Sequence, residues 1–337
     1  MMKAIVVKDK LLTCPDDMRV STIPVPKLEA GHALVHVESV GANFFDILMI
    51  QGKYQVKPPM PFTPGSEFSG TIEQVHPSCT KFKVGDRVFG SVAWGAYAQK
   101  IAAPESQLFH IPSNLNFDQA AGIFVTYPTS YAALKLRAEL QKGQSVLVLA
   151  AAGGVGIAAV QIAKAMGATV IAAVGSEAKF DVCLQNGADH AISYGGENSK
   201  TWTQQVLKLT NGKGVNVVYD PIGMIAESLK CIAWNGKALV VGFAGGDIEK
   251  IASNRILLKN VSVVGIHWGA YTRNEPERIP EVWEGLFDLI ERGLVTPVVY
   301  NPIYYGLENS NKCLNEIISR RTFGKVVVKP NHDSSKL

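Results

Sequence analysis

The chain has 337 residues, of which 47% are hydrophobic and 18% are charged, and this length exceeds what one hydrophobic core usually holds. We therefore expect two domains. The 33 Lys and Arg residues nearly balance the 29 Asp and Glu residues, giving a formal net charge of +4, and the basic residues are scattered. This charge pattern argues against a nucleic-acid partner.

The five cysteines are an odd number without a C-x-x-C spacing, which predicts reduced, buried thiols in an intracellular protein. Residues 3–7 begin an apparent strand directly, so we expect no signal peptide. The longest uncharged run, residues 143–163, is long enough to span a bilayer. Its central glycines and its change from a strand pattern to a helix pattern favour a buried strand–turn–helix, and we expect no membrane segment.

The first third of the chain is rich in predicted strands. Short alternating runs such as 33–37 and 69–75 are separated by clusters of Gly and Pro, as at 57–61. Strands this short and frequent predict a partly closed barrel.

From about residue 127, apolar strands alternate with helical segments such as 154–166 and 177–186. This alternation predicts a doubly wound parallel sheet. The six predicted strands are 145–149, 169–173, 190–193, 215–219, 237–241 and 261–266. The chain beyond 268, with a helix at 280–292 and a strand at 325–329, is expected to return to the first domain because the sheet is then complete. The polar residues 331–337 are expected to form a flexible tail.

The most informative segment is the turn after the first of these six strands. Residues 151–156 match G-x-G-x-x-G, with Ala151 at the first glycine position. Gly153 would let the backbone approach a pyrophosphate, and Gly156 would let the helix pack closely on the strand. The amides of Gly154 and Val155 at the helix start would face this anion. The position between strand and helix favours a dinucleotide site over a structural turn.

The end of the second strand distinguishes NADPH from NADH. An NAD-binding site has a carboxylate there for the ribose hydroxyls. Here Gly175 and Ser176 would leave room for a 2′-phosphate, and Lys179 lies close enough in sequence to neutralise its charge. The alternative is that Glu177 binds ribose, although an acid in the first turn of a helix also interacts with the helix dipole. We predict NADPH.

Four segments occur in the order typical of one superfamily: Asn43-Phe44-Phe45-Asp46, Gly65-Ser66-Glu67, 84–88 and 151–156. Together they resemble the medium-chain dehydrogenase/reductase superfamily. Over residues 3–330 the chain is similar to its zinc-free, zeta-crystallin-like NADPH:quinone oxidoreductases. The resemblance implies an α/β fold with two domains. These are a GroES-like, partly open β-barrel catalytic domain (1–126 and 268–330) and a Rossmann NADPH-binding domain (127–267).

The catalytic zinc ligands of the superfamily's alcohol dehydrogenases are missing. Ser66 stands at the histidine of their Gly-His-Glu, and Asn43 stands where their first cysteine would be. Neither a hydroxyl nor an amide replaces an imidazole or thiolate on zinc, so we expect no metal. Without a Lewis acid, the favoured direction is from NADPH to an electron-poor acceptor. A quinone suits such a site, because the protein then supplies mainly positioning and a dry cavity.

The resemblance also implies roles for residues outside the glycine turn. Asn43 and Tyr54 are expected near the acceptor as hydrogen-bond donors, or else as a turn cap and a half-buried surface tyrosine. Thr129 is expected near the nicotinamide, or as a helix cap, and Tyr194 beside the 2′-phosphate. Five further cofactor residues are Phe243, Ala244, Gly245, His267 and Trp268. The last is Arg320, for which Arg321 is the neighbouring alternative.

The strand 261–266 is apolar and would form an exposed sheet edge, which predicts a homodimer through this strand. The terminal Ser335-Lys336-Leu337 matches a peroxisomal address, or occurs there by chance. We therefore expect the peroxisomal matrix in a eukaryote and the cytoplasm otherwise. The predicted function is NADPH-dependent quinone reduction. The alternatives are reduction of activated C=C bonds in enals, enones or enoyl thioesters, and cofactor binding without turnover.

Overall fold

The computed structural model describes residues 1–331, and the chain forms two compact units. Unit 1 comprises residues 1–125 and the chain from residue 297, and unit 2 comprises residues 126–296. The chain therefore returns to the first domain at residue 297, about one helix later than the predicted residue 268. Residues 268–296 belong to unit 2 because α10 (Arg278–Glu291) packs against α3 (Thr126–Ala132).

The last described residue, Asn331, is held by unit 1 and is not part of a free tail. Its side-chain amide donates to the carbonyl oxygens of Val37, at 2.5 Å, and Gln99, at 3.2 Å. The rest of the predicted tail, including Ser335-Lys336-Leu337, lies outside the described residues.

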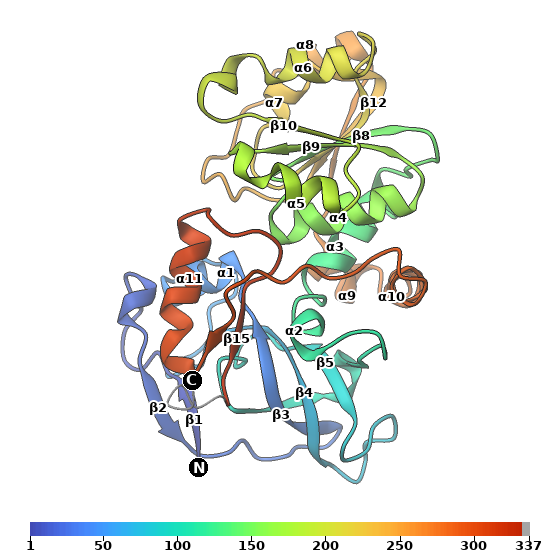
Figure 1. Cartoon of the computed structure of the whole chain (residues 1–337). Helices are drawn as coiled ribbons and strands as arrows, with labels where there is room; N and C mark the ends of the chain where they lie inside the picture. The colour runs from blue at the N-terminus through green and yellow to red at the C-terminus, as the bar shows by residue number, and fades with distance from the viewer. Residues whose placement is uncertain (332–337) are drawn as a thin grey trace. The chain divides into compact units, whose positions relative to one another are not determined.

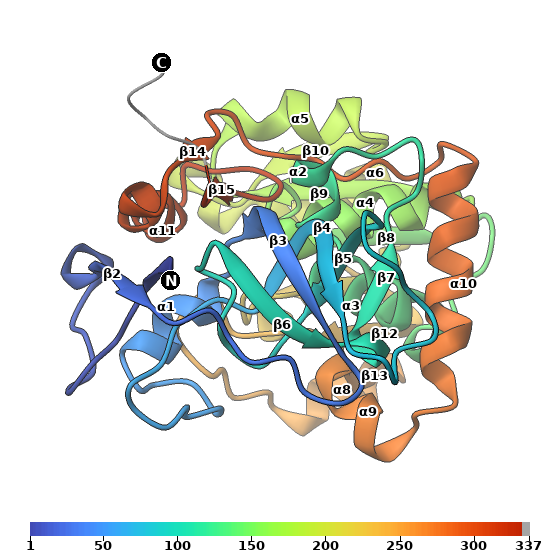
Figure 2. The ribbon, with the colours of Figure 1, turned by 90° about the horizontal axis from the view of Figure 1, so that it is seen from below.

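Unit 1 is built on a seven-stranded sheet with the GroES-like, partly open barrel arrangement. The long strand β3 (His32–Gly41) pairs antiparallel with three strands (Figure 2). The path through the sheet runs β14 (Tyr304–Tyr305), β15 (Val327–Lys329), β3, β4 (Glu67–Val75), β5 (Arg87–Ser91) and β7 (Leu108–His110), while β6 (Lys100–Pro104) pairs with β3. A separate ribbon joins β1 (Met2–Ile5) to β2 (Val20–Ile23). The α-helices of unit 1 are α1 (Phe44–Ile50), α2 (Phe117–Ala120) and α11 (Ser310–Ile318).

Unit 2 contains the predicted doubly wound sheet, with all six strands parallel. Their order is β10 (His190–Ser193), β9 (Thr169–Val174), β8 (Ser145–Leu149), β11 (Val215–Asp220), β12 (Ile232–Val240) and β13 (Ser262–Gly265). The strand β12 begins five residues before its predicted start at 237. Asn235-Gly236, which suggests a turn, lies instead where the register of β12 shifts against β11, and Asn235 takes a φ of 60°.

Helices cover both faces of this sheet, with α4 (Gly154–Ala165) and α5 (Phe180–Gln185) on one side and α6 (Trp202–Leu209) and α8 (Ser253–Lys259) on the other (Figure 1). The short helices α7 (Ile225–Ser228) and α9 (Tyr271–Asn274) complete the unit. Because both faces are covered, the central strands are almost continuously apolar; Val146 to Leu149 of β8 are fully buried.

All five cysteines are free, as predicted, but only three of them are buried: Cys183, Cys231 and Cys313. Cys14 and Cys79 are partly exposed, so the prediction of burial was wrong for these two. Within residues 1–331, no helix has both the length and the apolar character required to cross a bilayer.

Candidate functional site

The carboxyl edge of the parallel sheet in unit 2 carries the glycine turn. Gly153 is the extended N-cap of α4, and its amide donates to the carbonyl oxygen of Ala150 over 2.9 Å. A Cβ on Gly156 would overlap that same oxygen, so only glycine lets α4 start this close to β8. Among the described residues, no side chain caps α4. The first amides of this 12-residue helix are therefore available to an anion.

The helix α3 is attached to this turn. Ser130 Oγ donates to the carbonyl oxygen of Val155 over 2.8 Å and lies 2.8 Å from the hydroxyl oxygen of Tyr219. Thr129, the preceding residue on α3, is half-buried. These contacts hold the segment that carries Thr129 against the first turn of α4.

The end of β9 brings together residues predicted to surround a 2′-phosphate. Gly175 and Ser176 are exposed, and a Cβ on Gly175 would lie 3.6 Å from the ring of Tyr194, which follows β10. Lys179 is partly buried, and this burial lowers the pKa of its ammonium. Asn198 Nδ2 donates to Glu177 Oε1 over 3.4 Å, so the alternative ribose-binding carboxylate already has a partner.

The loops that follow β11 and β12 are joined along their backbones. The amides of Ala244 and Gly245 donate to the carbonyl oxygens of Pro221 and Ile222 at 3.0 and 3.1 Å, and Phe243 is 44% exposed.

Two carboxylates hold these loops. Asp220 accepts hydrogen bonds from the amides of residues 222–224, and Glu249 accepts from those of Ile225 and Ala226 at the start of α7. Burial raises the pKa of Asp220, although the three amides oppose this shift. Asp220 therefore fixes the loop after β11, and Glu249 joins the loop after β12 to the start of α7.

The remaining predicted cofactor residues lie in different units. His267 is exposed after β13, at the carboxyl edge of the sheet, and the ring of Trp268 packs against Tyr271 with centroids 5.2 Å apart. Arg320 belongs to unit 1, where it follows α11 with a φ of 57° and is exposed.

Unit 1 contains a buried polar cluster that the sequence did not indicate. Lys325 forms an ion pair with Glu67 Oε1 and donates to Asn43 Oδ1 over 2.6 Å. Asn43 Nδ2 donates in turn to Glu67 Oε1 at 2.9 Å and to the carbonyl oxygen of Gly41 at 3.3 Å. All three side chains are more than 90% buried. We call Asn43, Asp46, Glu67, Tyr97 and Lys325 the Lys325 cluster.

Asp46 is the ionisable member of the cluster whose charge is least compensated. The Asp46 Oδ2 atom accepts hydrogen bonds from the backbone amide of Asn43 at 2.9 Å and from the Tyr97 hydroxyl at 3.3 Å. Its Oδ1 is buried and has no hydrogen-bond partner within residues 1–331. Burial raises the pKa of Asp46 to about 7. The hydrogen bond from the backbone amide of Asn43 and the charge of Lys325 oppose this shift, but their effects are smaller. This carboxyl group therefore exchanges its proton near neutral pH.

The two residues predicted at the acceptor have different surroundings. The Asn43 side chain already hydrogen-bonds at both its oxygen and its nitrogen, so donation to an acceptor would require it to leave Glu67 or Gly41. Tyr54 is half-buried, and its ring stacks on Phe45 with centroids 5.1 Å apart. Burial raises the pKa of the Tyr54 phenol, which keeps it protonated and able to donate at neutral pH.

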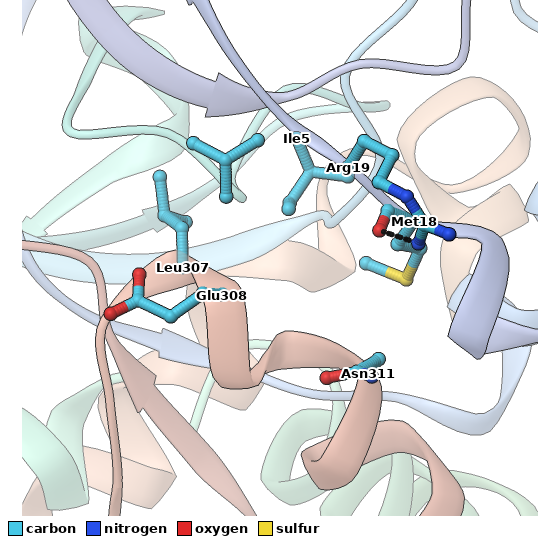
Figure 3. A pocket seen from close by; sticks show the side chains of 7 residues that line it. Ile5, Met18, Arg19, Leu307, Glu308 and Asn311 are labelled. Carbon is cyan, nitrogen blue, oxygen red and sulfur yellow. Dashed lines mark hydrogen bonds between the residues drawn. The ribbon is translucent and has the colours of Figure 1, made fainter.

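A hollow of about 330 Å³ also lies in unit 1 (Figure 3). It is lined by Ile5, Met18, Arg19, Val20, Leu307, Glu308 and Asn311. The Arg19 guanidinium folds back to donate to the Met18 carbonyl oxygen at 2.8 Å. No residue predicted to bind cofactor or acceptor lines this hollow.

Comparison with known proteins agrees with the architecture. Residues 29–113 match the alcohol dehydrogenase GroES-like domain, and residues 154–291 match the zinc-binding dehydrogenase family. The quinone oxidoreductase-like protein 2 homolog of Nematostella vectensis is 39% identical over 330 residues, covering 97% of this chain and 86% of the relative. The quinone oxidoreductase of Pseudomonas aeruginosa is 35% identical, covering 88% and 90%.

Solved structures lead to the same group. The Escherichia coli quinone oxidoreductase, complexed with NADPH, has a TM-score of 0.86 at 28% identity and covers 97% of this chain and 100% of its own. The Thermus thermophilus quinone oxidoreductase, also solved with NADPH, has a TM-score of 0.84 at 32% identity, with the same coverage. The fold and the glycine turn define a dinucleotide-linked oxidoreductase of the medium-chain dehydrogenase/reductase type. Within that class, the chain belongs to the zinc-free, quinone oxidoreductase-like family.

The description of the second matching family raises the question of zinc, and the residues do not fit this ion. Asn43 Oδ1 already accepts from the Lys325 ammonium, and Ser66 Oγ donates to the carbonyl oxygen of Ala93 over 3.3 Å. Zinc sites use thiolate, imidazole or carboxylate ligands, and a resident ammonium repels a second cation. Within residues 1–331, no three His, Cys, Asp or Glu side chains are grouped as a metal site requires.

Proposed function

We propose that this protein transfers a hydride from NADPH to a quinone without a metal ion. The observation that carries the proposal is the uncapped, glycine-lined start of α4, next to a β9 end that has no carboxylate of its own. An anionic dinucleotide with a 2′-phosphate is the ligand that such an edge favours. The NADPH complexes of the related quinone oxidoreductases support the same cofactor.

The proposed cofactor contacts follow the edge of the sheet in unit 2. The amides of Gly154 and Val155 bind the pyrophosphate, and Gly153 and Gly156 leave it room. The residues Gly175, Ser176, Lys179 and Tyr194 surround the 2′-phosphate, with Lys179 supplying the charge. The proposed contacts nearer the nicotinamide are Thr129, the loop Phe243, Ala244 and Gly245, and His267 with Trp268. The last proposed cofactor contact is Arg320.

The proposed acceptor contacts come from unit 1. When bound, the reduced nicotinamide supplies the hydride, and the chain's own residues hold the acceptor and donate hydrogen bonds to it. Tyr54 donates its phenolic proton in a hydrogen bond to a quinone oxygen. Asn43 lies at the start of α1, and the Lys325 cluster orients it.

A second candidate is reduction of an activated C=C bond, and Asp46 is the observation that favours it. Such a reaction adds a hydride to one carbon and a proton to its neighbour, so it needs an acid that gives up a proton near pH 7. The buried Asp46, with a pKa of about 7, belongs to the same cluster as Asn43.

We also propose a homodimer formed through β13. Among residues 1–331 this strand pairs only with β12, and its Val263 and Val264 are half-buried, so one edge offers unpaired backbone groups. The nearby Leu257 and Leu258 on α8 are 77% and 72% exposed, which adds apolar surface next to this edge. Light scattering that gives a monomer mass at micromolar concentration would contradict the dimer. The peroxisomal address remains a proposal that rests on the terminal tripeptide alone.

The test of function is a substrate panel with the purified full chain. Oxidation of NADPH is followed with 1,4-benzoquinone, 9,10-phenanthrenequinone and a 2-alkenal, and each reaction is repeated with NADH. Quinone-dependent oxidation that prefers NADPH is the expected result. Turnover of the alkenal alone selects the second candidate. Tight NADPH binding without turnover of any acceptor leaves a binding protein, and equal use of NADH contradicts the cofactor assignment.

A further inference from the structure

Glu177 is the carboxylate that follows directly after Gly175 and Ser176 at the end of β9. It is exposed and begins the 3-10 helical segment 177–179, which ends at Lys179. A carboxylate at this edge accepts hydrogen bonds from the ribose hydroxyls of NADH, but it repels the 2′-phosphate of NADPH. The direction in which the Glu177 side chain points therefore affects the choice between the two cofactors.

A second loop lies beside Glu177. The strands β9 and β10 pair in parallel, so the loops that follow them leave the same edge of the sheet. The two loops stay in contact beyond the strands, because a Cβ on Gly195 would overlap the carbonyl oxygen of Gly175. Glycine at 195 therefore lets the 3-10 helical segment 196–200 approach the end of β9. From this segment, Asn198 Nδ2 donates to Glu177 Oε1 over 3.4 Å.

Asn198 is held more firmly than the carboxylate that it contacts. Asn198 is half-buried, whereas Glu177 is exposed. Gln205 Nε2, on α6, donates to Asn198 Oδ1 over 3.2 Å, and this bond turns the Asn198 amide nitrogen toward Glu177. The backbone amide of Asn198 donates to the Gly195 carbonyl oxygen at 3.2 Å, and its own carbonyl oxygen accepts from the Thr201 amide at 3.0 Å. Asn198 is therefore a fixed donor on which the carboxylate aligns.

We propose that Asn198 is a positioning residue that selects NADPH by holding the Glu177 carboxylate away from the adenosine ribose. With the carboxylate held there, a 2′-phosphate meets the Lys179 ammonium without an opposing negative charge. Without Asn198, Glu177 is released to accept from the ribose 2′-hydroxyl, which NADH has and NADPH lacks. Specificity then depends on keeping a repulsive group out of the site. This inference rests on the proposed function, because it concerns the 2′-phosphate of the proposed cofactor.

The experiment is a double-mutant cycle that compares the Kd values for NADPH and NADH, measured by fluorescence titration of the purified full chain. Asn198→Leu is expected to raise the Kd for NADPH about fivefold, as for the loss of one hydrogen bond, and to lower the Kd for NADH. Glu177→Gln alone is expected to keep the preference for NADPH. In Asn198→Leu/Glu177→Gln the Kd for NADPH is expected to equal that of Glu177→Gln, because no carboxylate is left to release.

The matched control is Asn311→Leu, which removes an amide that donates to Asp16 Oδ1 over 3.2 Å in unit 1 and should change neither Kd. If Asn198 only stabilises its loop, Asn198→Leu weakens both cofactors equally, and that result would overturn the proposal. A loss of NADPH affinity that persists in the double variant would overturn it as well. A wild type that binds NADPH no more tightly than NADH would contradict the proposed cofactor and this inference together. Tight wild-type binding of NADPH with an uncoupled pair would overturn the role of Asn198 alone.

Discussion

Replacing Asp46 with Asn should stabilise the protein at alkaline pH and have little effect below about pH 4. Asp46 is fully buried, and burial raises the pKa of its carboxyl group from 3.8 to about 7. The folded protein therefore holds this proton more tightly than the unfolded chain does. As pH rises from about 4 to about 7, the unfolded chain loses the proton first, so the free energy of unfolding falls across this range.

The magnitude follows from the shift. A difference of about 3 pH units, at about 1.4 kcal/mol per unit, corresponds to about 4 kcal/mol that Asp46 costs the folded state above pH 7. Asn has nearly the same shape and carries no charge. In the wild type, the backbone amide of Asn43 and the Tyr97 hydroxyl donate to Asp46 Oδ2. The side-chain oxygen of the new Asn can accept the same two hydrogen bonds.

The assay is urea unfolding of the wild type and of Asp46→Asn at pH 5 and at pH 8. We expect a more stable variant at both pH values, by about 2 kcal/mol at pH 5 and by up to about 4 kcal/mol at pH 8. Asp9→Asn, at an exposed carboxylate of the same unit, is the control and should change neither value. A variant that is no more stable than the wild type at pH 8, or a difference that does not depend on pH, would refute the reasoning.

Three further predictions concern unit 2. Gly156→Ala should weaken NADPH binding more than about tenfold, because the new Cβ overlaps the Ala150 carbonyl oxygen and displaces α4. Fluorescence titration measures the Kd for NADPH, and an unchanged Kd would contradict this prediction. Lys179→Ala should weaken NADPH binding about tenfold and leave NADH unaffected, because only NADPH carries the 2′-phosphate. An equal loss for both cofactors would remove Lys179 from that site. Glu249→Gln should speed hydrogen exchange in the loop 242–246, because the carboxylate that binds the α7 amides is lost, and wild-type exchange would contradict this role.

The sequence by itself determined the features that depend on local pattern. Alternating apolar residues and apolar runs placed all six strands of the parallel sheet, because strands covered on both faces are apolar throughout. The turn 151–156 was equally visible, since the close approach of α4 to β8 demands glycine at 156. The predicted strand 237–241 started five residues too late, because a register shift carries β12 through Asn235-Gly236, a dipeptide that usually makes a turn.

Only the tertiary structure decided which distant residues meet. Lys325 lies 282 positions from Asn43, and nothing in a lysine at the start of a predicted strand indicates that it will be buried against Glu67. The raised pKa of Asp46 arises from burial, which is a property of the packed unit and not of Asn43-Phe44-Phe45-Asp46. The assignment of residues 268–296 to unit 2 likewise depends on α10 packing against α3. Backbone periodicity is local, whereas charge compensation, burial and helix packing depend on the neighbours that folding supplies.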